Sequence, residues 1–393
     1  MKPDRRPLRS FRCLLLLPLL ACVAPALAFC ADIEKPDIFA DLLLNTQTAG
    51  RVGVISSDLG SAGRFSTVSL DGLPFSTLTG VHSDAVGRFH DGRVYIVNRL
   101  NRDNIQVLQP SLAFLTVLEF SVGAGSNPHD IAIASSAKAY VSLYERNYLL
   151  IVNPTVGAII GSINLAAYAD ADGIPEASAL YIDGGSLYVA LQRLDRNDPS
   201  GKLPPNSPSI LLEIDTATDT IVAAHTFPDS RNPFGRFRPV NLGGVPHIAI
   251  ACPNRLGFIS ALDGGVQAFN LVTRSFRPGL LYGEVAAGGD ILDVVFLDQN
   301  RAYASVLDAA FNKTLQRFDP ITGQRTAVLA FFPADSGFIS GLELSPDGSR
   351  LFTGNVDLNA PGISVYDTRR GDVPITAAPI SVGLRPIDLF SLE

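Results

Sequence analysis

A unit of four short β-type runs, separated by Gly, Pro, Asn and Asp, repeats along this chain from about Thr48 to its end. The third unit is the plainest example, with strands expected at His129–Ala134, Lys138–Leu143, Tyr148–Asn153 and Gly157–Leu165. No stretch carries a sustained apolar period of 3.6 residues, so helices are not expected. A sheet of four strands cannot bury both of its faces alone, and units of this kind must therefore stack on one another.

The repeats share a position at the start of their first strand, where five units carry an acidic residue and two carry glycine. These residues are Asp84, Asp130, Glu176, Gly235, Asp293, Gly341 and Asp388. The two longest intervals between them contain the loops 197–208 and 253–265. The chain begins its repeats on a second-type strand, at residues 51–55, and ends on a first-type strand, at residues 386–392. The last strand should therefore complete the first unit, which predicts an all-β, seven-bladed β-propeller of four-stranded antiparallel blades.

The N-terminus has the pattern of a targeting segment. Basic residues come first, an apolar run follows from Cys13, and Ala26-Leu27-Ala28 fits a cleavage site. This predicts a secretory signal peptide over residues 1–28, a tail over 29–47 and the propeller over 48–393. The alternative is a lipobox at Leu19-Leu20-Ala21-Cys22, in which Cys22 is lipidated. Both alternatives place the body outside the cytoplasm, either periplasmic or secreted, or anchored to the membrane as a lipoprotein.

Composition excludes several classes of protein. The formal net charge is −7, which argues against a nucleic-acid partner. The single Met is the initiator and no Cys-x-x-Cys-His occurs, so Met-ligated and c-type haems are excluded. The absence of Trp excludes WD40 repeats and quinone-binding propellers with a Trp-bearing repeat. Cys252 ends an apolar strand and is expected to be a buried small hydrophobe, whereas its pairing with Cys30 stays open.

Several stretches resemble a known family. The YVTN-type, YncE-like β-propellers of bacterial periplasms and surfaces have units similar to Asn127–Ala132, Ser345–Gly348 and Val365–Thr368. A subgroup of predicted bacterial lipoproteins has longer stretches similar to His82–Val86, Asp170–Glu176 and Leu191–Arg196. The resemblance covers about residues 48–393. It implies the fold and an extracytoplasmic location, and it implies no particular reaction.

In such a fold the first strands line a central channel, and the loops leading into them open on one face, here called the mouth face. The carboxylates of Asp84, Asp130, Glu176, Asp293 and Asp388 are expected to ring the mouth of the channel. They would bind a hard divalent cation such as Ca²⁺, or they would accept hydrogen bonds from backbone N–H groups of neighbouring blades. Arg99 and Arg193 follow second strands on the same face, which suits a polar ligand or a protein partner.

Two further groups are candidate metal ligands. Asp170 and Asp172, close to Glu176, imitate part of a calcium loop, although a turn whose Asp side chains bond their own backbone is the alternative. His82 and His129 precede Asp84 and Asp130 on adjacent loops, where they would bind a transition metal or contact water and partners.

The sequence thus favours an exported, monomeric, non-catalytic binding or scaffold propeller of the bacterial cell envelope. Its mouth face would recognise a protein or a small polar ligand, with a divalent cation as candidate cofactor and a lipid anchor as the only membrane contact. No Gly-x-Ser-x-Gly motif or nucleophile beside a histidine assigns a reaction. The alternative is a metal-assisted hydrolase of the lactonase or lyase type, with its site at the channel mouth.

Overall fold

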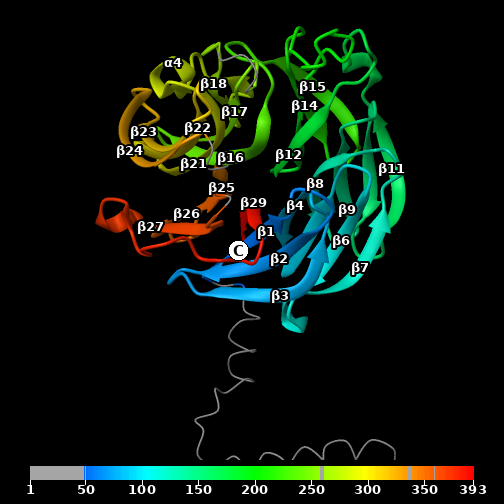
Figure 1. Ribbon diagram of the computed structural model, residues 1–393. Helices are drawn as coiled ribbons and strands as arrows, with labels where there is room; N and C mark the ends of the chain where they lie inside the picture. Colours follow the sequence, from blue (N-terminus) through cyan, green and yellow to red (C-terminus); the bar gives the residue numbers. More distant parts are fainter. Residues whose placement is uncertain (1–47, 49, 257–260, 335–338, 358) are drawn as a thin grey trace, which may run out of the picture. The chain divides into compact units, whose positions relative to one another are not determined.

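The computed structural model describes residues 48, 50–256, 261–334, 339–357 and 359–393. The predicted signal peptide, the tail, Cys22 and Cys30 lie outside these residues. The described part of the chain forms seven antiparallel sheets that follow one another around a ring (Figure 1). Six sheets have four strands and one has a short fifth, which confirms the predicted seven-bladed propeller. No helix in the described ranges is both long enough and apolar enough to cross a membrane.

The blades are numbered here from the one that holds the first strand. Blade 1 contains β1 (Arg51–Ser57), β2 (Gly63–Ser69), β3 (Pro74–Val81) and β29 (Arg385–Ser391). Blade 2 contains β4 (Ala85–His90), β5 (Arg93–Asn98), β6 (Asn104–Gln109) and β7 (Leu115–Ser121). Blade 3 contains β8 (Pro128–Ser135), β9 (Lys138–Leu143), β10 (Tyr148–Asn153) and β11 (Ala158–Asn164). Blade 4 contains β12 (Ala177–Asp183), β13 (Ser186–Leu191), β14 (Ile210–Asp215) and β15 (Thr220–Thr226).

The remaining blades follow the same order. Blade 5 contains β16 (Phe234–Leu242), β17 (Val245–Cys252), β18 (Gly265–Asn270), β19 (Ser275–Phe276) and β20 (Tyr282–Gly283). Blade 6 contains β21 (Asp290–Asp298), β22 (Arg301–Leu307), β23 (Lys313–Asp319) and β24 (Gln324–Phe332). Blade 7 contains β25 (Ile339–Leu344), β26 (Arg350–Asn355), β27 (Gly362–Asp367) and β28 (Val373–Pro374).

Strand β29 closes the ring. It pairs antiparallel with β1, where Leu389 lies opposite Val54 and Asp388 lies opposite Ile55. The C-terminal strand therefore supplies the inner strand of blade 1, as the order of the repeats predicted. Inner strands of neighbouring blades contact one another around the whole ring, including β29 with both β4 and β25.

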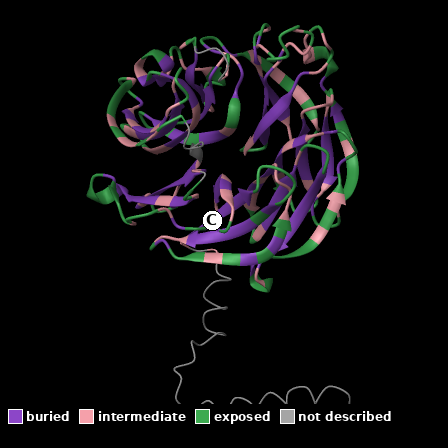
Figure 2. Cartoon of the chain, viewed as in Figure 1, coloured by how far each residue is buried: buried purple, intermediate pink, exposed green. Residues whose placement is uncertain are grey.

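The second strands form the centre of the core because both faces of each blade are covered by its neighbours. All six residues of β13 are buried, and Tyr140 of β9 is buried among residues of blades 3 and 4. Outer strands such as β15 alternate between exposed and half-buried side chains, since only one of their faces is covered (Figure 2). Cys252 is buried, as predicted for a small hydrophobe, and it forms no disulfide with another cysteine in the described part of the chain.

The expectation of no helix was wrong in detail. One turn of α-helix, α4 (Glu284–Ala287), leads into β21, and short 3-10 turns lie at Pro110–Leu112, Ala166–Tyr168 and Thr368–Arg370. Gly288 follows α4 with a φ of 78°. This left-handed conformation ends the helix, and glycine adopts it without the steric cost that a side chain would add. A single turn is too short to leave an apolar period in the sequence.

Candidate functional site

Three of the predicted carboxylates form a repeated hydrogen bond between blades. Asp130, Asp293 and Asp388 occupy equivalent places in β8, β21 and β29, each just after a bulge in the pairing with the second strand. Each accepts a backbone N–H from the inner strand of the next blade. The bonds run from Leu180 to Asp130 at 2.9 Å, from Leu342 to Asp293 at 2.9 Å and from Gly87 to Asp388 at 2.8 Å. These contacts support the hydrogen-bonding interpretation of the carboxylates.

Three arginines of the inner strands balance these acids. Arg88 of β4 lies 2.8 Å from Asp130, and Arg236 of β16 is paired with Asp388. Arg238 of β16 reaches Glu343 at 2.7 Å and Asp293 at 3.3 Å. The sequence analysis missed these arginines, although a basic residue inside an otherwise apolar first strand was a visible signal.

The assumed equivalence of Asp84 and Glu176 with the other acids was wrong. The second-strand tyrosines Tyr95, Tyr140 and Tyr188 pair with Arg88, Ala132 and Tyr181. Asp130 lies two residues before the tyrosine's partner in blade 3. The residue at the same place is Val86 in blade 2 and Ala179 in blade 4, and neither is acidic. The inner strands have β-bulges at different places, and each bulge shifts the sequence position of the equivalent residue by one. Asp84 and Glu176 therefore precede their strands and do not belong to one ring with Asp130.

Asp84 and Glu176 have arginine partners of their own on the mouth face. Arg99 donates to Asp84 through two of its nitrogens. Glu176 is fully buried, accepts the N–H of Leu194 at 2.9 Å and pairs with Arg196, which also pairs with Glu145. Burial raises the pKa of Glu176 to about 7, although Arg196 and the N–H of Leu194 favour its anion.

The other predicted site residues are engaged locally. Arg193 donates to the carbonyl oxygens of Pro208 and Ala169, at 2.8 and 3.4 Å. Asp172 accepts the N–H groups of Ile174 and Arg196, and Asp170 accepts that of Asp172.

The predicted metal ligands do not gather. The ring of His82 bonds the backbone of Asp84, whereas His129 stacks on an aromatic ring. Within the described ranges, no three His, Cys, Asp or Glu side chains are grouped so that they could hold a metal ion.

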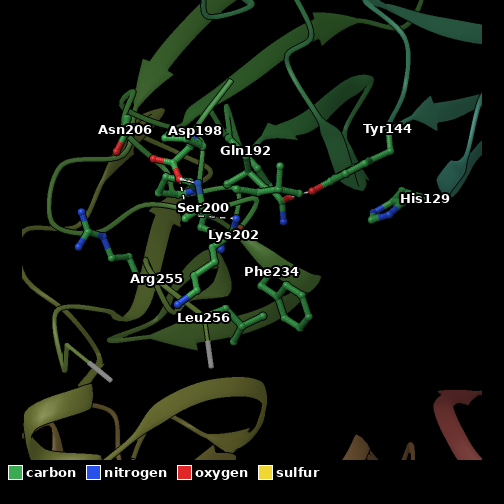
Figure 3. Close-up of a pocket in the computed structure, with 15 residues that line it drawn as sticks. His129, Tyr144, Gln192, Asp198, Ser200, Lys202, Asn206, Phe234, Arg255 and Leu256 are labelled. Atoms are coloured by element: carbon green, nitrogen blue, oxygen red, sulfur yellow. Dashed lines mark hydrogen bonds between the residues drawn. The ribbon is translucent and has the colours of Figure 1, made fainter. Parts of the chain in front are cut away.

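A cavity of about 450 Å³ opens beside the channel, under the predicted insertion between β13 and β14. Its residues come from loops and strand ends of blades 3, 4 and 5 (Figure 3). The lining consists of His129, Tyr144, Gln192, Leu194, Asp198, Pro199, Ser200, Lys202, Leu203, Pro204, Asn206, Asn232, Phe234, Arg255 and Leu256. The sequence analysis placed His129 on this face, but it did not identify Phe234, Asn232 or Arg255.

One wall of the cavity contains two stacked rings, those of His129 and Tyr144. The rings of His129 and Tyr144 are 4.2 Å apart and nearly parallel, and Arg196 lies over the tyrosine ring at 5.5 Å. The Tyr144 hydroxyl donates to Oε1 of Gln192 at 2.7 Å, as Figure 3 shows, and Gln192 donates to the carbonyl of Pro233. Burial and the charge of Arg99 hold the pKa of His129 well below its usual range, so its imidazole is neutral at physiological pH.

A second cavity, of about 260 Å³, lies in the channel mouth and adjoins the first. Both are lined by His129, Gln192 and Phe234. The charged side chains around the second cavity are Arg88, Arg99, Arg236, Asp293 and Asp388, so cations outnumber carboxylates. Contrary to expectation, the mouth is not lined mainly by acids.

The fold has known counterparts, although no family model and no curated protein matches this chain. A dihydro-haem d1 dehydrogenase, NirN, is similar in structure, with 16% identity, a TM-score of 0.58 and coverage of 88% of this chain and 76% of that one. A provisional 6-phosphogluconolactonase of Bacteroides fragilis has 14% identity, a TM-score of 0.61 and coverage of 88% and 98%. Another, of Bacteroides uniformis, has 13% identity, a TM-score of 0.62 and coverage of 88% and 99%. At such identities the likeness identifies this chain as a β-propeller and extends to the fold alone.

Proposed function

We propose that this protein is a non-catalytic binding propeller of the bacterial cell envelope that holds a small molecule in the cavity beside its channel. The observation that carries the proposal is the cavity itself. Its volume of about 450 Å³ lies within the range typical of small-molecule sites, and a few polar groups stand among carbon-rich side chains.

The cavity is held open by contacts of its own walls. Asp195 and Pro204 join the two sides of the insertion by a backbone hydrogen bond of 2.9 Å, and Asn206 donates to Asp195 at 2.8 Å. Arg231 fastens the same loop by donating to the carbonyl oxygens of Pro205 and Asn206. A wall fixed in this way loses little conformational entropy when a ligand enters, which favours binding.

The channel acids favour binding over the hydrolase alternative. Both oxygens of Asp130, Asp293 and Asp388 accept backbone N–H groups or bond arginine. A carboxylate that serves as a general base or a metal ligand needs a lone pair directed at its target. These three instead join neighbouring blades and balance the charge of the inner-strand arginines.

The proposed location depends on the N-terminal residues and has its own test. Intact-mass measurement of the protein purified from its native host identifies the first residue of the mature chain. Cleavage after Ala28 leaves Phe29 first, and lipidation leaves a diacylated or triacylated Cys22. A chain that retains its first 28 residues would overturn the proposed export.

Ligand binding is tested with N-phenyl-1-naphthylamine, a neutral aromatic probe that fluoresces in apolar sites. We expect saturable binding at one site per chain. Ser200→Phe places a ring into the cavity from an exposed loop position and should weaken binding about tenfold. The matched control is Ser61→Phe, on an exposed loop of blade 1, which should bind as the wild type does. Absence of saturable binding, or equal binding by Ser200→Phe, would overturn the proposal.

A further inference from the structure

The body of the cavity is apolar and includes side chains that are costly to leave in water. Phe234 and Leu203 line it while 36% and 38% of their surfaces are exposed. Leu194, Pro199, Pro204 and Leu256 complete this part of the lining. Exposed apolar groups gathered in a concavity mark a surface that another molecule covers.

Two uncharged polar side chains of the lining, His129 and Asn232, have atoms that could form further hydrogen bonds. Neither ring nitrogen of His129 has a hydrogen-bond partner among the described residues. Asn232 is only 6% exposed, and its amide nitrogen donates to the carbonyl of Asn254 at 3.0 Å. Its Oδ1 is buried without a partner in the described part of the chain. A buried acceptor of this kind is costly unless a donor reaches it, which points to a ligand that carries an N–H or O–H group.

The charged part of the lining is cationic overall. The lining contains two cationic side chains, Lys202 and Arg255, and one carboxylate, Asp198. Oδ1 of Asp198 accepts the N–H and the hydroxyl of Ser200. In the adjoining channel mouth each arginine of the lining is paired with a carboxylate, so the mouth adds no net positive charge. The whole chain nevertheless has a net charge of −7. A local excess of cations on an acidic protein attracts an anionic group to this place in particular.

We infer that the cavity takes an aromatic anion: a flat, apolar ring system that carries a carboxylate or sulfonate group and a hydrogen-bond donor. The inference rests on the proposed function and adds the chemical class of the ligand. The rings lie between Phe234 and Leu203, the donor meets Asn232 or His129, and the acidic group lies near Arg255.

The test compares two probes that differ by one charge. 8-Anilino-1-naphthalenesulfonate has the same ring system as N-phenyl-1-naphthylamine and adds a sulfonate, and both carry an anilino N–H. We expect the sulfonate to bind the full chain at least about fivefold more tightly than the neutral probe at low salt, with the difference shrinking as salt screens the charges.

Substitution of Arg255 locates the effect. Arg255→Gln keeps much of the side-chain length and should weaken sulfonate binding about fivefold, while the affinity for the neutral probe stays within twofold. Arg370→Gln is the control, since its side chain is 84% exposed on blade 7 and lies outside the cavity lining. Circular dichroism and the Tm of each variant verify that it is folded.

The possible results separate the two proposals. A preference for the sulfonate that Arg255→Gln removes and Arg370→Gln leaves in place supports the aromatic anion. Binding of both probes with equal affinity, or an unchanged preference in Arg255→Gln, overturns the ligand class and leaves the binding cavity standing. Failure of both probes to bind overturns the proposed function together with the inference.

Discussion

His129 lies flat against Tyr144, with ring centroids 4.2 Å apart and planes inclined by 15°. His129 lies in β8 and Tyr144 directly follows β9, both in blade 3, and the tyrosine hydroxyl bonds Gln192 at the end of β13 in blade 4. The stack therefore fixes a neutral imidazole between the cavity and the channel mouth. Its geometry depends on contacts across two blades and on no single segment of sequence.

The stack should matter more for ligand binding than the hydroxyl does. Tyr144→Leu removes the ring under His129 and should lower affinity for N-phenyl-1-naphthylamine about tenfold. Tyr144→Phe keeps the ring, loses only the bond to Gln192 and should stay within about threefold of the wild type. Fluorescence titration of the two variants decides the matter, and equal losses in both would contradict the role given to the stack.

Removing an inter-blade carboxylate should destabilise the ring. Asp130→Ala leaves Arg88 and the N–H of Leu180 without their partner and should lower the free energy of unfolding by about 3 kcal/mol. Asp130→Ala combined with Arg88→Met should cost less than the two single changes added together, because neither charge is then left unpaired. Urea denaturation measures these differences. Asp183→Ala, at the exposed end of β12, serves as the control, and an additive double variant would contradict the pairing.

A buried glutamate gives stability a pH dependence. Glu284 of α4 is fully buried and accepts the N–H groups of Gly264 and Ile291, and burial raises its pKa to about 8 from an ordinary 4.5. Because the folded pKa lies above the unfolded one, the native state binds more protons between these values. The contribution of protonated Glu284 to the free energy of unfolding is therefore complete below about pH 4.5 and is lost as pH rises through about 8.

Urea denaturation at pH 5, 7 and 9 tests this dependence. Stability of the wild type relative to Glu284→Gln should fall as pH rises across that range, since glutamine does not titrate. Glu119→Gln, at an exposed position on β7, is the matched control for the loss of a glutamate elsewhere in the propeller. Parallel curves for wild type and Glu284→Gln would show that Glu284 does not titrate in this window.

Cys252 should be chemically inert in the native protein. Its thiol is buried, and desolvation together with the charge of Glu284 holds its pKa well above the usual range. Native protein treated with iodoacetamide should give an unmodified Cys252 peptide in mass spectrometry, whereas protein denatured in urea should give the alkylated one. Alkylation of Cys252 under native conditions would mean that blade 5 opens readily.

Most of the fold could be predicted because each blade repeats its own local signals. Turn residues separate the short strands of every blade, and second strands such as β9 and β13 carry the apolar residues that a strand covered on both faces requires. Ring closure followed from the strand types at the two ends of the chain. The short helical turns and the two-residue fifth strand of blade 5 were not predicted, since elements this short leave no periodic pattern.

The candidate site was harder to predict, for physical reasons. The acids at positions 84 and 176 resemble Asp130 in sequence, but bulges inside the strands decide which residue reaches the ring. The cavity joins His129 of blade 3 with Phe234 and Arg255 of blade 5, more than 100 residues later in the chain. A cavity between blades depends on how their loops pack together, and it cannot be predicted from composition or from the spacing of motifs.

Closure of the ring by β29 also determines when blade 1 can be completed during synthesis of the chain. The ribosome synthesises β1, β2 and β3 before every other strand of the propeller, whereas the inner strand of the same blade, Arg385–Ser391, follows all of them. Until those residues arrive, β1 keeps one unpaired edge and blade 1 lacks the strand that contacts both β4 and β25. The ring can therefore close only after β29 has been synthesised, so blade 1 is the first blade to be begun and the last to be completed.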